Sequence, residues 1–203
     1  LFLPRLLVSA LVIVALIILT GALHLDGLID TFDGFAVRGS ASERLNIMAD
    51  SRVGAFGAMA ATCLILLKYV ALISVPGSLL AVALLLMPTL GRWSAAYSLA
   101  TFPSAKNEGI GKTFKQGAGW PMLAFSTLIA TAIAIVFLPY TGVILMAVTW
   151  IIVFLTAKLF SSRLGGLTGD TYGAIIEITE VFVLISIIII GKAGGTSWLD
   201  SYL

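Results

Sequence analysis

The chain has 203 residues, of which 60% are hydrophobic and only 11% are charged. Soluble domains average about a quarter charged residues, so this chain carries more apolar surface than a core of its size buries, and lipid is the expected solvent for the rest. A formal net charge of +2 without a dense Lys/Arg tract argues against a nucleic-acid partner, and a single cysteine, Cys63, excludes an internal disulfide.

Six apolar runs are long enough to cross a hydrocarbon layer about 30 Å thick. They are Leu6–Leu23, Ala55–Val75, Leu79–Ala100, Trp120–Leu138, Gly142–Phe160 and Ala174–Ile190. Pro76-Gly77 and Pro139 mark tight turns between neighbouring helices. We therefore expect an all-α, polytopic integral membrane helical bundle of about six transmembrane helices, with residues 1–203 forming a single membrane-embedded catalytic domain. Because the chain opens at Leu1 directly in an apolar stretch, we read it as a segment that lacks native N-terminal sequence.

The connections between these runs alternate in character. Those near Pro76 and Pro139 are short and uncharged, and the other three are long and polar: His24–Gly54, Thr101–Gly119 and Ser161–Gly173. Alternation of six spans places the three polar connections on one face. The basic residues of that face are Arg38, Arg44, Arg52, Lys106, Lys112, Lys115 and Arg163, against Arg5 and Lys192 on the other. Because a Lys/Arg excess marks the cytoplasmic side, we expect a protein of the cytoplasmic (inner) membrane whose active face looks into the cytoplasm.

Three aspartates follow the first apolar run, in the segment HLDGLIDTFDG. Asp26, Asp30 and Asp33 are spaced i, i+4 and i+7, which places them on one face of a helix. Three carboxylates this close repel one another, and Mg²⁺, which takes oxygen ligands, removes that repulsion. The alternative is an amphipathic interfacial helix whose acids face water, although such helices usually carry Lys or Arg on their polar face.

Two neighbouring features have a structural alternative beside the functional one. His24 is either a catalytic residue, for substrate contact or proton transfer, or a hydrogen-bonding residue at the membrane boundary. Asp50-Ser51-Arg52, just before the second span, is either part of the acidic site or a segment that caps and anchors a helix.

A glycine-rich loop, RLGGLTGD, leads into the last span. Glycines let backbone N–H groups approach a phosphate, and the N-terminus of a helix favours an anion. Arg163, Gly166, Thr168 and Gly169 are therefore candidate phosphate-binding residues, and Asp170 is a candidate metal ligand. Ordinary turns have a similar composition, so the loop alone is a weak signal.

Glu177 and Glu180 lie at i and i+3 inside the last apolar run. An ionisable residue inside a membrane helix costs at least about 2.5 kcal/mol, so it is a functional candidate by default. The alternative is that the two glutamates pair with Lys68 or Arg92 on other spans.

Seven of the ten acidic residues fall in three clusters: Asp26–Asp33, Asp50 and Asp170–Glu180. Acids gathered around metal bind a polyphosphate through bridging cations, while Arg52, Arg92 or Arg163 neutralises the remaining charge. A carboxylate then deprotonates an attacking hydroxyl. The residues thus indicate metal-dependent chemistry on a phosphate, carried out on a substrate handled at a membrane.

The motifs HLDGLIDTFDGF, ERLNIMADSRVGAFGA and RLGGLTGDTYGAIIEITE stand in this order along the chain, with GRW at Gly91–Trp93 and EGIGKTF at Glu108–Phe114 between the last two. Together they span nearly the whole chain, and in combination they resemble the cobalamin-5′-phosphate synthase family, also called adenosylcobinamide-GDP ribazoletransferase. Members of that family usually have further sequence before the helix that ends here at Leu23.

The resemblance implies that the phosphoryl-cobinamide unit of adenosylcobinamide-GDP is transferred to the ribose hydroxyl of α-ribazole or α-ribazole 5′-phosphate, with release of GMP and with Mg²⁺ as cofactor. By this likeness the metal or pyrophosphate ligands are Asp26, Asp30, Asp33, Asp50 and Asp170. The candidate catalytic residues are Asp33, Asp50, Glu177, Glu180 and His24. The lipid bilayer is the expected surroundings, and small-residue pairs such as Gly54 and Gly57 allow the close packing that a homo-oligomer would use.

Two other functions share parts of this pattern. Asp30-x-x-Asp33-Gly34 resembles the start of the signature of CDP-alcohol phosphotransferases, but the Ala-Arg expected two residues after the glycine is absent. A cation-coupled transporter would also place Glu177 and Glu180 in mid-membrane. Against a transporter, the acids gather towards one face of the membrane.

Overall fold

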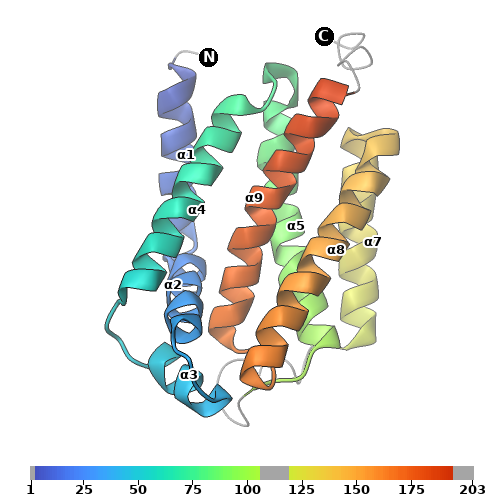
Figure 1. Cartoon of the computed structure of the whole chain (residues 1–203). Coiled ribbons are helices and arrows are strands. Elements are labelled where there is room, and N and C mark those ends of the chain that lie inside the picture. Colours follow the sequence, from blue (N-terminus) through green and yellow to red (C-terminus); the bar gives the residue numbers. More distant parts are fainter. Residues whose placement is uncertain (1–2, 106–118, 194–203) are drawn as a thin grey trace.

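The computed structural model of the chain describes residues 3–105 and 119–193, and these residues are helical almost throughout. In chain order the elements are α1 (Arg5–Leu19), α2 (Leu23–Ala36), α3 (Ala41–Met48), α4 (Ala55–Ser74), the 3₁₀ turn η1 (Gly77–Leu79), α5 (Leu80–Thr101), α7 (Trp120–Phe137), α8 (Pro139–Leu164) and α9 (Gly169–Ala193). The expected all-α class is confirmed (Figure 1).

Five helices in the described residues, α4, α5 with η1, α7, α8 and α9, are long and apolar enough to cross a membrane. The number is six if α1 and α2 are counted as one broken span. Their outward faces are apolar, since Leu67, Phe125, Leu155 and Ile189 each expose more than half of their surface. Such surfaces are stable in lipid and not in water, so the fold is that of an integral membrane protein.

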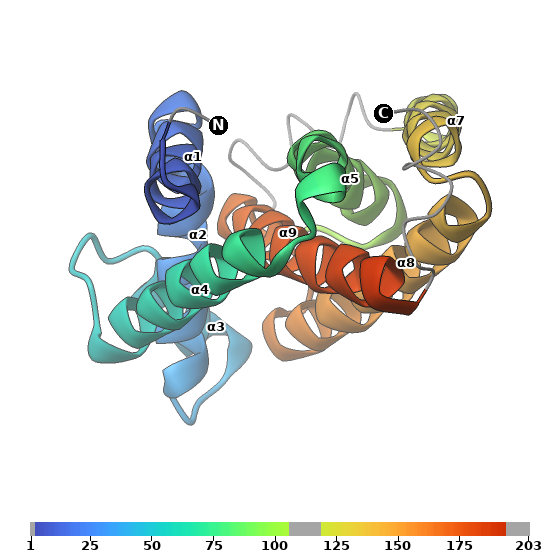
Figure 2. The same ribbon diagram turned by 90° about the horizontal axis from the view of Figure 1, so that it is seen from above.

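The first span is not the unbroken helix expected over Leu6–Leu23. Helix α1 ends at Leu19, and α2 starts at Leu23 at an angle of 86° to it. Gly21 and Ala22 both take left-handed backbone angles, with φ of 58° and 60°, which an alanine adopts at a cost of roughly 1–2 kcal/mol. The amide of Ala22 donates to the carbonyl of Ile17 and closes α1. As a result, α2 leaves the direction of the bundle and passes beneath α1 (Figures 1 and 2).

Helix α9 is the central element of the bundle. Viewed from above it runs through the middle, with α4 and α2 on one side and α5 and α8 on the other (Figure 2). In its most apolar stretch, 61% of the residues are buried within the protein, the largest share among the described spans. Residues on α9 therefore face neighbours on every side, and a polar group on it needs a partner from another helix.

The connections alternate as expected from the sequence. The turns that join α4 to α5 and α7 to α8 lie at the upper end of the bundle in Figure 1, and α3 and the link from α8 to α9 lie at the lower end. Two hydrogen bonds join the lower connections. The amide of Ala105 donates to the carbonyl of Leu167 at 2.9 Å, and the amide of Leu167 donates to the carbonyl of Pro103 at 2.8 Å. Lys106, Lys112, Lys115 and Glu108–Phe114 lie outside the described residues.

Helix α2 packs on α9 and on α4 through glycines. A Cβ atom on Gly27 would lie 2.6 Å from the carbonyl oxygen of Asp170, and one on Gly173 would lie 3.0 Å from the Cα of His24. On the other side of α2, a Cβ on Gly57 of α4 would lie 2.5 Å from the carbonyl oxygen of Ile29. These backbones touch only because the glycines have no side chain, as in other close-packed membrane helices.

We therefore expect Gly27→Ala to destabilise the protein, because the added methyl group overlaps the backbone of α9. Overpacking of this kind costs about 1–3 kcal/mol, which outweighs the gain in helix propensity of alanine over glycine of about 1 kcal/mol. The measurement is the apparent unfolding temperature in detergent micelles. Gly77→Ala is the control, because no atom lies within 4 Å of a Cβ there. Equal unfolding temperatures for the two variants would contradict the packing described for α2 and α9.

Candidate active site

The acids of α2 and the start of α9 meet where the two helices cross. Gly27, which touches the backbone of Asp170, is adjacent to Asp26 and one turn before Asp30. Asp26 is exposed, while Asp30 and Asp170 are half-buried. The hydroxyl of Thr168 donates to the Oδ2 of Asp170 at 3.3 Å, which orients that carboxylate at the first turn of α9. The structure thus brings the part of α2 that carries Asp26 and Asp30 beside Asp170 at the start of α9.

Asp33 has a structural task that the sequence did not indicate. Its side chain is buried at the junction of α2 and α4, where Oδ2 accepts the amide of Gly54 at 2.7 Å and Oδ1 accepts the amide of Gly57 at 2.8 Å. Gly54 is the N-cap residue of α4, so Asp33 caps α4 from another helix. A carboxylate satisfies the first amides of a helix and is favoured by the positive end of its dipole. Metal binding and catalysis by Asp33 stay predictions beside this role.

Glu177 and Glu180 form ion pairs with Lys68 and Arg92, which was the structural alternative for the two glutamates. The ammonium group of Lys68 on α4 donates to the Oε2 of Glu177 at 2.6 Å and to the Oε2 of Glu180 at 2.7 Å. The guanidinium group of Arg92 on α5 donates to the other oxygen of Glu180. We call these four residues the charge cluster. Its two anions and two cations balance, as they must where lipid surrounds the helices.

Lys68 is the functional candidate that the sequence analysis did not select. It is only 3% exposed, and it is the single charged residue of the apolar run Ala55–Val75. A lone lysine in a membrane helix is a signal of the same kind as the two glutamates on α9. In the sequence analysis it entered only as a partner for them.

The GRW segment at Gly91–Trp93 contacts both α9 and α7. A Cβ on Gly91 would lie 3.0 Å from the Cγ of Glu180, so this glycine makes room for the carboxylate. Arg92 pairs with the same carboxylate. The indole Nε1 of Trp93, on the other side of α5, donates to the hydroxyl of Thr127 on α7 at 2.9 Å. The segment thus joins the charge cluster to the outer helices.

His24 lies between the crossing and the charge cluster. Its backbone touches Gly173 on α9, and its side chain is within electrostatic range of Arg92, Glu180 and Lys68. Its Nδ1 atom is buried and has no hydrogen-bond partner in the described part of the chain. The catalytic role of His24 stays a prediction.

Asp50 and Arg52 form an exposed pair of their own. The Nε of Arg52 donates to Oδ1 of Asp50 at 3.0 Å, and its Nη2 donates to Oδ2 at 2.6 Å. These bonds lower the pKa of Asp50 to about 2, so the carboxylate is ionised at every physiological pH. Among the described residues its contacts are with Arg52 alone. The structure does not join Asp50 to the acids at the crossing, and its predicted roles as metal ligand and catalytic residue stay untested.

The glycine-rich loop packs against the segment that follows α5. Gly166 has φ of 157°, and a Cβ there would lie 2.5 Å from the amide nitrogen of Ala105. Thr168 caps α9, since its hydroxyl accepts the amide of Thr171 at 3.3 Å. Gly169 has open space around its Cα, and Arg163 is exposed. Gly166 is thus occupied by a structural contact, whereas Gly169 and Arg163 are accessible; phosphate binding by the loop stays a prediction.

Magnesium binding by the carboxylates at the crossing stays a prediction. In the described residues no three His, Cys, Asp or Glu side chains form a ready metal site. Mg²⁺ does not require one, because it is usually held by one or two carboxylates together with phosphate oxygens and water. Asp26 and Asp30 lie on α2 beside Gly27, which touches the backbone of Asp170, so these residues are the candidates for one or two such ligands.

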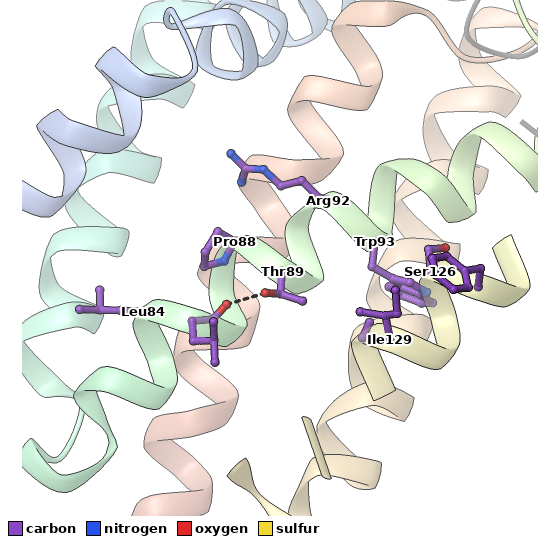
Figure 3. Close-up of a pocket in the computed structure, with 10 residues that line it drawn as sticks. Leu84, Pro88, Thr89, Arg92, Trp93, Ser126 and Ile129 are labelled. Carbon is purple, nitrogen blue, oxygen red and sulfur yellow. Dashed lines mark hydrogen bonds between the residues drawn. The ribbon is translucent and has the colours of Figure 1, made fainter. Parts of the chain in front are cut away.

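A groove between α5 and α7 lies outside this site. It has a volume of about 510 Å³ and is lined almost entirely by apolar side chains, with Arg92 at its edge (Figure 3). The side chain of Arg92 extends away from Trp93, Ser126 and Ile129, which line the groove (Figure 3). The groove is therefore separate from the crossing of α2 and α9, and the guanidinium group of Arg92 belongs to the charge cluster.

Residues 1–188 match the family model described as cobalamin-5-phosphate synthase. Its curated relatives include proteins named adenosylcobinamide-GDP ribazoletransferase. The protein from Roseiflexus sp. (strain RS-1) is 39% identical over 87% of this chain and 65% of its own length. The one from Acetivibrio thermocellus is 40% identical over 91% of this chain and 75% of its own length. The one from Synechococcus elongatus is 41% identical, with shares of 88% and 72%. No solved structure matches the chain.

We expect Asp33→Asn to destabilise the protein, because the amide group offers one acceptor oxygen to two N–H donors and turns its NH₂ group towards the other. Leaving a buried donor unsatisfied costs about 1–3 kcal/mol. Urea or thermal unfolding in micelles measures the loss. Asp26→Asn, at an exposed position of the same helix, is the matched control and should change stability by less than about 0.5 kcal/mol. If Asp33→Asn proves as stable as its control, Asp33 does not hold α4 to α2.

Proposed function

The chain belongs to the cobalamin-5-phosphate synthase family, and from this membership we propose that it transfers the phosphoryl-cobinamide unit of adenosylcobinamide-GDP to the ribose hydroxyl of α-ribazole or α-ribazole 5′-phosphate, releasing GMP. The names of the relatives support this reaction. The chain spans between 65% and 75% of the length of these relatives. The observation in the structure that supports the proposal is the backbone contact of Gly27 with Asp170, which brings the part of α2 that carries Asp26 and Asp30 to the start of α9.

The reaction is an exchange at one phosphorus atom of a diphosphate. The ribose oxygen forms a bond to the phosphorus that bears cobinamide, and the bond from that phosphorus to the bridging oxygen breaks. The bonding electrons leave with GMP, and the proton of the ribose hydroxyl goes to a base. The protein must therefore hold a diphosphate, align a hydroxyl opposite the leaving oxygen and accept a proton.

We assign proton acceptance to a carboxylate at the crossing, Asp30 or Asp170, both of which are partly accessible. Glu180 is less suited, since it is 2% exposed and has a cation on each oxygen. Arg92, by contrast, keeps 43% of its side chain exposed and so is able to bind a phosphate oxygen.

Magnesium is part of this proposal. One or two of the carboxylates Asp26, Asp30 and Asp170 would hold it together with oxygens of the diphosphate and water. A bound Mg²⁺ neutralises charge on the transferring phosphoryl group and on the leaving oxygen.

We also propose that the chain lies in the cytoplasmic membrane with the crossing of α2 and α9 towards the cytoplasm. The exposed cations Arg38, Arg52 and Arg163 belong to that end of the bundle, which agrees with the excess of Lys and Arg on cytoplasmic loops. Both substrates would reach the site from the water side.

The proposed reaction predicts that purified protein releases GMP from adenosylcobinamide-GDP only when both α-ribazole, or its 5′-phosphate, and Mg²⁺ are present. Asp30→Asn and Asp170→Asn should each lower turnover by about 100-fold or more, the effect of losing one group that stabilises transition-state charge. Glu43→Gln is the control. Its carboxylate accepts the Ser40 amide at 2.7 Å in an exposed capping box, a bond that glutamine also makes. GMP release without an acceptor, or turnover near that of the unchanged protein in both aspartate variants, would refute the proposal.

The proposed orientation predicts the side on which a reporter is found. A reporter fused after Leu203 should be read outside the cytoplasm, and one inserted between Ser40 and Ala41, before α3, should be read inside. Paired alkaline phosphatase and fluorescent protein fusions measure both positions. A cytoplasmic signal at the first position with an external signal at the second would reverse the orientation.

A further inference from the structure

The charge cluster links three helices through one carboxylate. Lys68 on α4 holds Oε2 of Glu180 on α9 at 2.7 Å, and Arg92 on α5 holds the other oxygen of the same group. Glu177, one turn earlier on α9, accepts the second hydrogen bond of Lys68 at 2.6 Å. Glu180 is therefore the shared member, and Lys68 and Arg92 touch each other only through it.

The two cations are placed very differently. The side chain of Lys68 is 4% exposed and has both of its acceptors inside the protein, whereas that of Arg92 is 43% exposed. A guanidinium group has five N–H donors, and Glu180 engages it through Nη1, so donors remain for a second partner. Lys68 cannot reach a substrate, but Arg92 can.

Buried ion pairs are a poor means of adding stability. Their desolvation offsets most of their attraction, and apolar residues of the same size often do as well. The geometry here indicates a different use. Gly91 lets Glu180 pack directly on α5, with a Cβ on Gly91 only 3.0 Å from its Cγ, so the carboxylate has little freedom. A carboxylate clamped on one oxygen by Lys68 fixes the direction of the arginine on its other oxygen.

We propose that Lys68 is a positioning residue for substrate binding. It anchors Glu180 to α4, and Glu180 in turn aims the accessible donors of Arg92 at the anionic diphosphate of the nucleotide-activated substrate. Lys68 also cancels one of the two negative charges on α9. Without it the cluster would carry a net charge of −1 and would repel the diphosphate from Arg92. This inference rests on the proposed function, in which Arg92 contacts a phosphate.

The test removes Lys68 together with one glutamate, so that the charge stays balanced. In Lys68→Met/Glu177→Gln the pair of Glu180 and Arg92 remains, and the anchor to α4 is lost together with the Glu177 carboxylate. Glu177→Gln alone, which keeps Lys68 on Glu180, measures the share of the second substitution in any change of KM or kcat. We expect the unfolding temperature in micelles to stay close to that of the unchanged protein. The KM for adenosylcobinamide-GDP should rise about tenfold, because a hydrogen bond to a charged group is lost. The kcat should change by less than about threefold. Lys68→Arg, which keeps a cation at this position, should recover most of the KM.

Lys158→Met is the matched control. Lys158 lies on α8, with its ammonium group over the ring of Phe154 and outside the cluster, so its loss should leave both constants unchanged. If the double variant does not fold, Lys68→Gln/Glu177→Gln keeps the same balance with polar side chains, and the same split is expected. An unchanged KM in a folded, charge-balanced variant would overturn the inference and leave Lys68 a structural residue. Absence of GMP release from the unchanged protein would instead refute the proposed function itself.

Discussion

The close contact between the backbones of α2 and α9 is the constraint on which the rest of the site depends. Gly27 against Asp170 and Gly173 against His24 leave no room for a side chain between the two helices. This contact brings the part of α2 that carries Asp26 and Asp30 beside Asp170 at the start of α9, although the two segments are some 140 residues apart in the chain. The bend at Gly21 and Ala22 makes the contact geometrically possible, because a straight continuation of α1 would run along α9 and not across it. The left-handed angle of Ala22 is thus a local cost that the packing of α2 on both α9 and α4 offsets.

Lipid as a solvent explains why the buried charged side chains in the described part of the chain each bind a group on another helix. Asp33 of α2 accepts the first amides of α4, Arg44 of α3 donates to the carbonyls of Gly34 and Phe35 at the end of α2, and Arg5 of α1 donates to those of Leu72 and Val75 at the end of α4. In each case a charged side chain satisfies backbone groups that a helix terminus leaves open and that water does not reach. In the charge cluster, likewise, each charged group is paired: the two anions on α9 are balanced by two cations from different helices.

Much of this arrangement was predictable from the residues. Long apolar runs identify the spans, the spacing of Asp26, Asp30 and Asp33 identifies a helical face, and alternation of the spans places the polar connections at one end. The break after Leu19 was not predictable from the residues. Thr20-Gly21-Ala22 carries no charge and no proline, and the apolar run continues through it. Nor were the partners of Asp33 predictable, since they are backbone amides that no side-chain pattern reveals. Lys68 and the glutamates were each visible as isolated charges, but only the packing of α4 on α9 decides that they pair.

The two polar centres differ in what they are able to do. At the crossing the carboxylates are partly open and come from helices that meet at glycines, so a diphosphate with its cations has access to them. Glu180 lies ten residues further along α9 than Asp170, about 15 Å deeper in the bundle, and its carboxylate is closed off by Lys68 and Arg92. A reaction that exchanges one oxygen for another at phosphorus needs an open site for the metal and a rigid one for orientation. His24, on α2 beside Gly173 and within electrostatic range of Arg92, lies where the two centres approach each other. We therefore expect the transferring phosphoryl group to sit between them, with the acids of α2 on one side and the guanidinium group of Arg92 on the other.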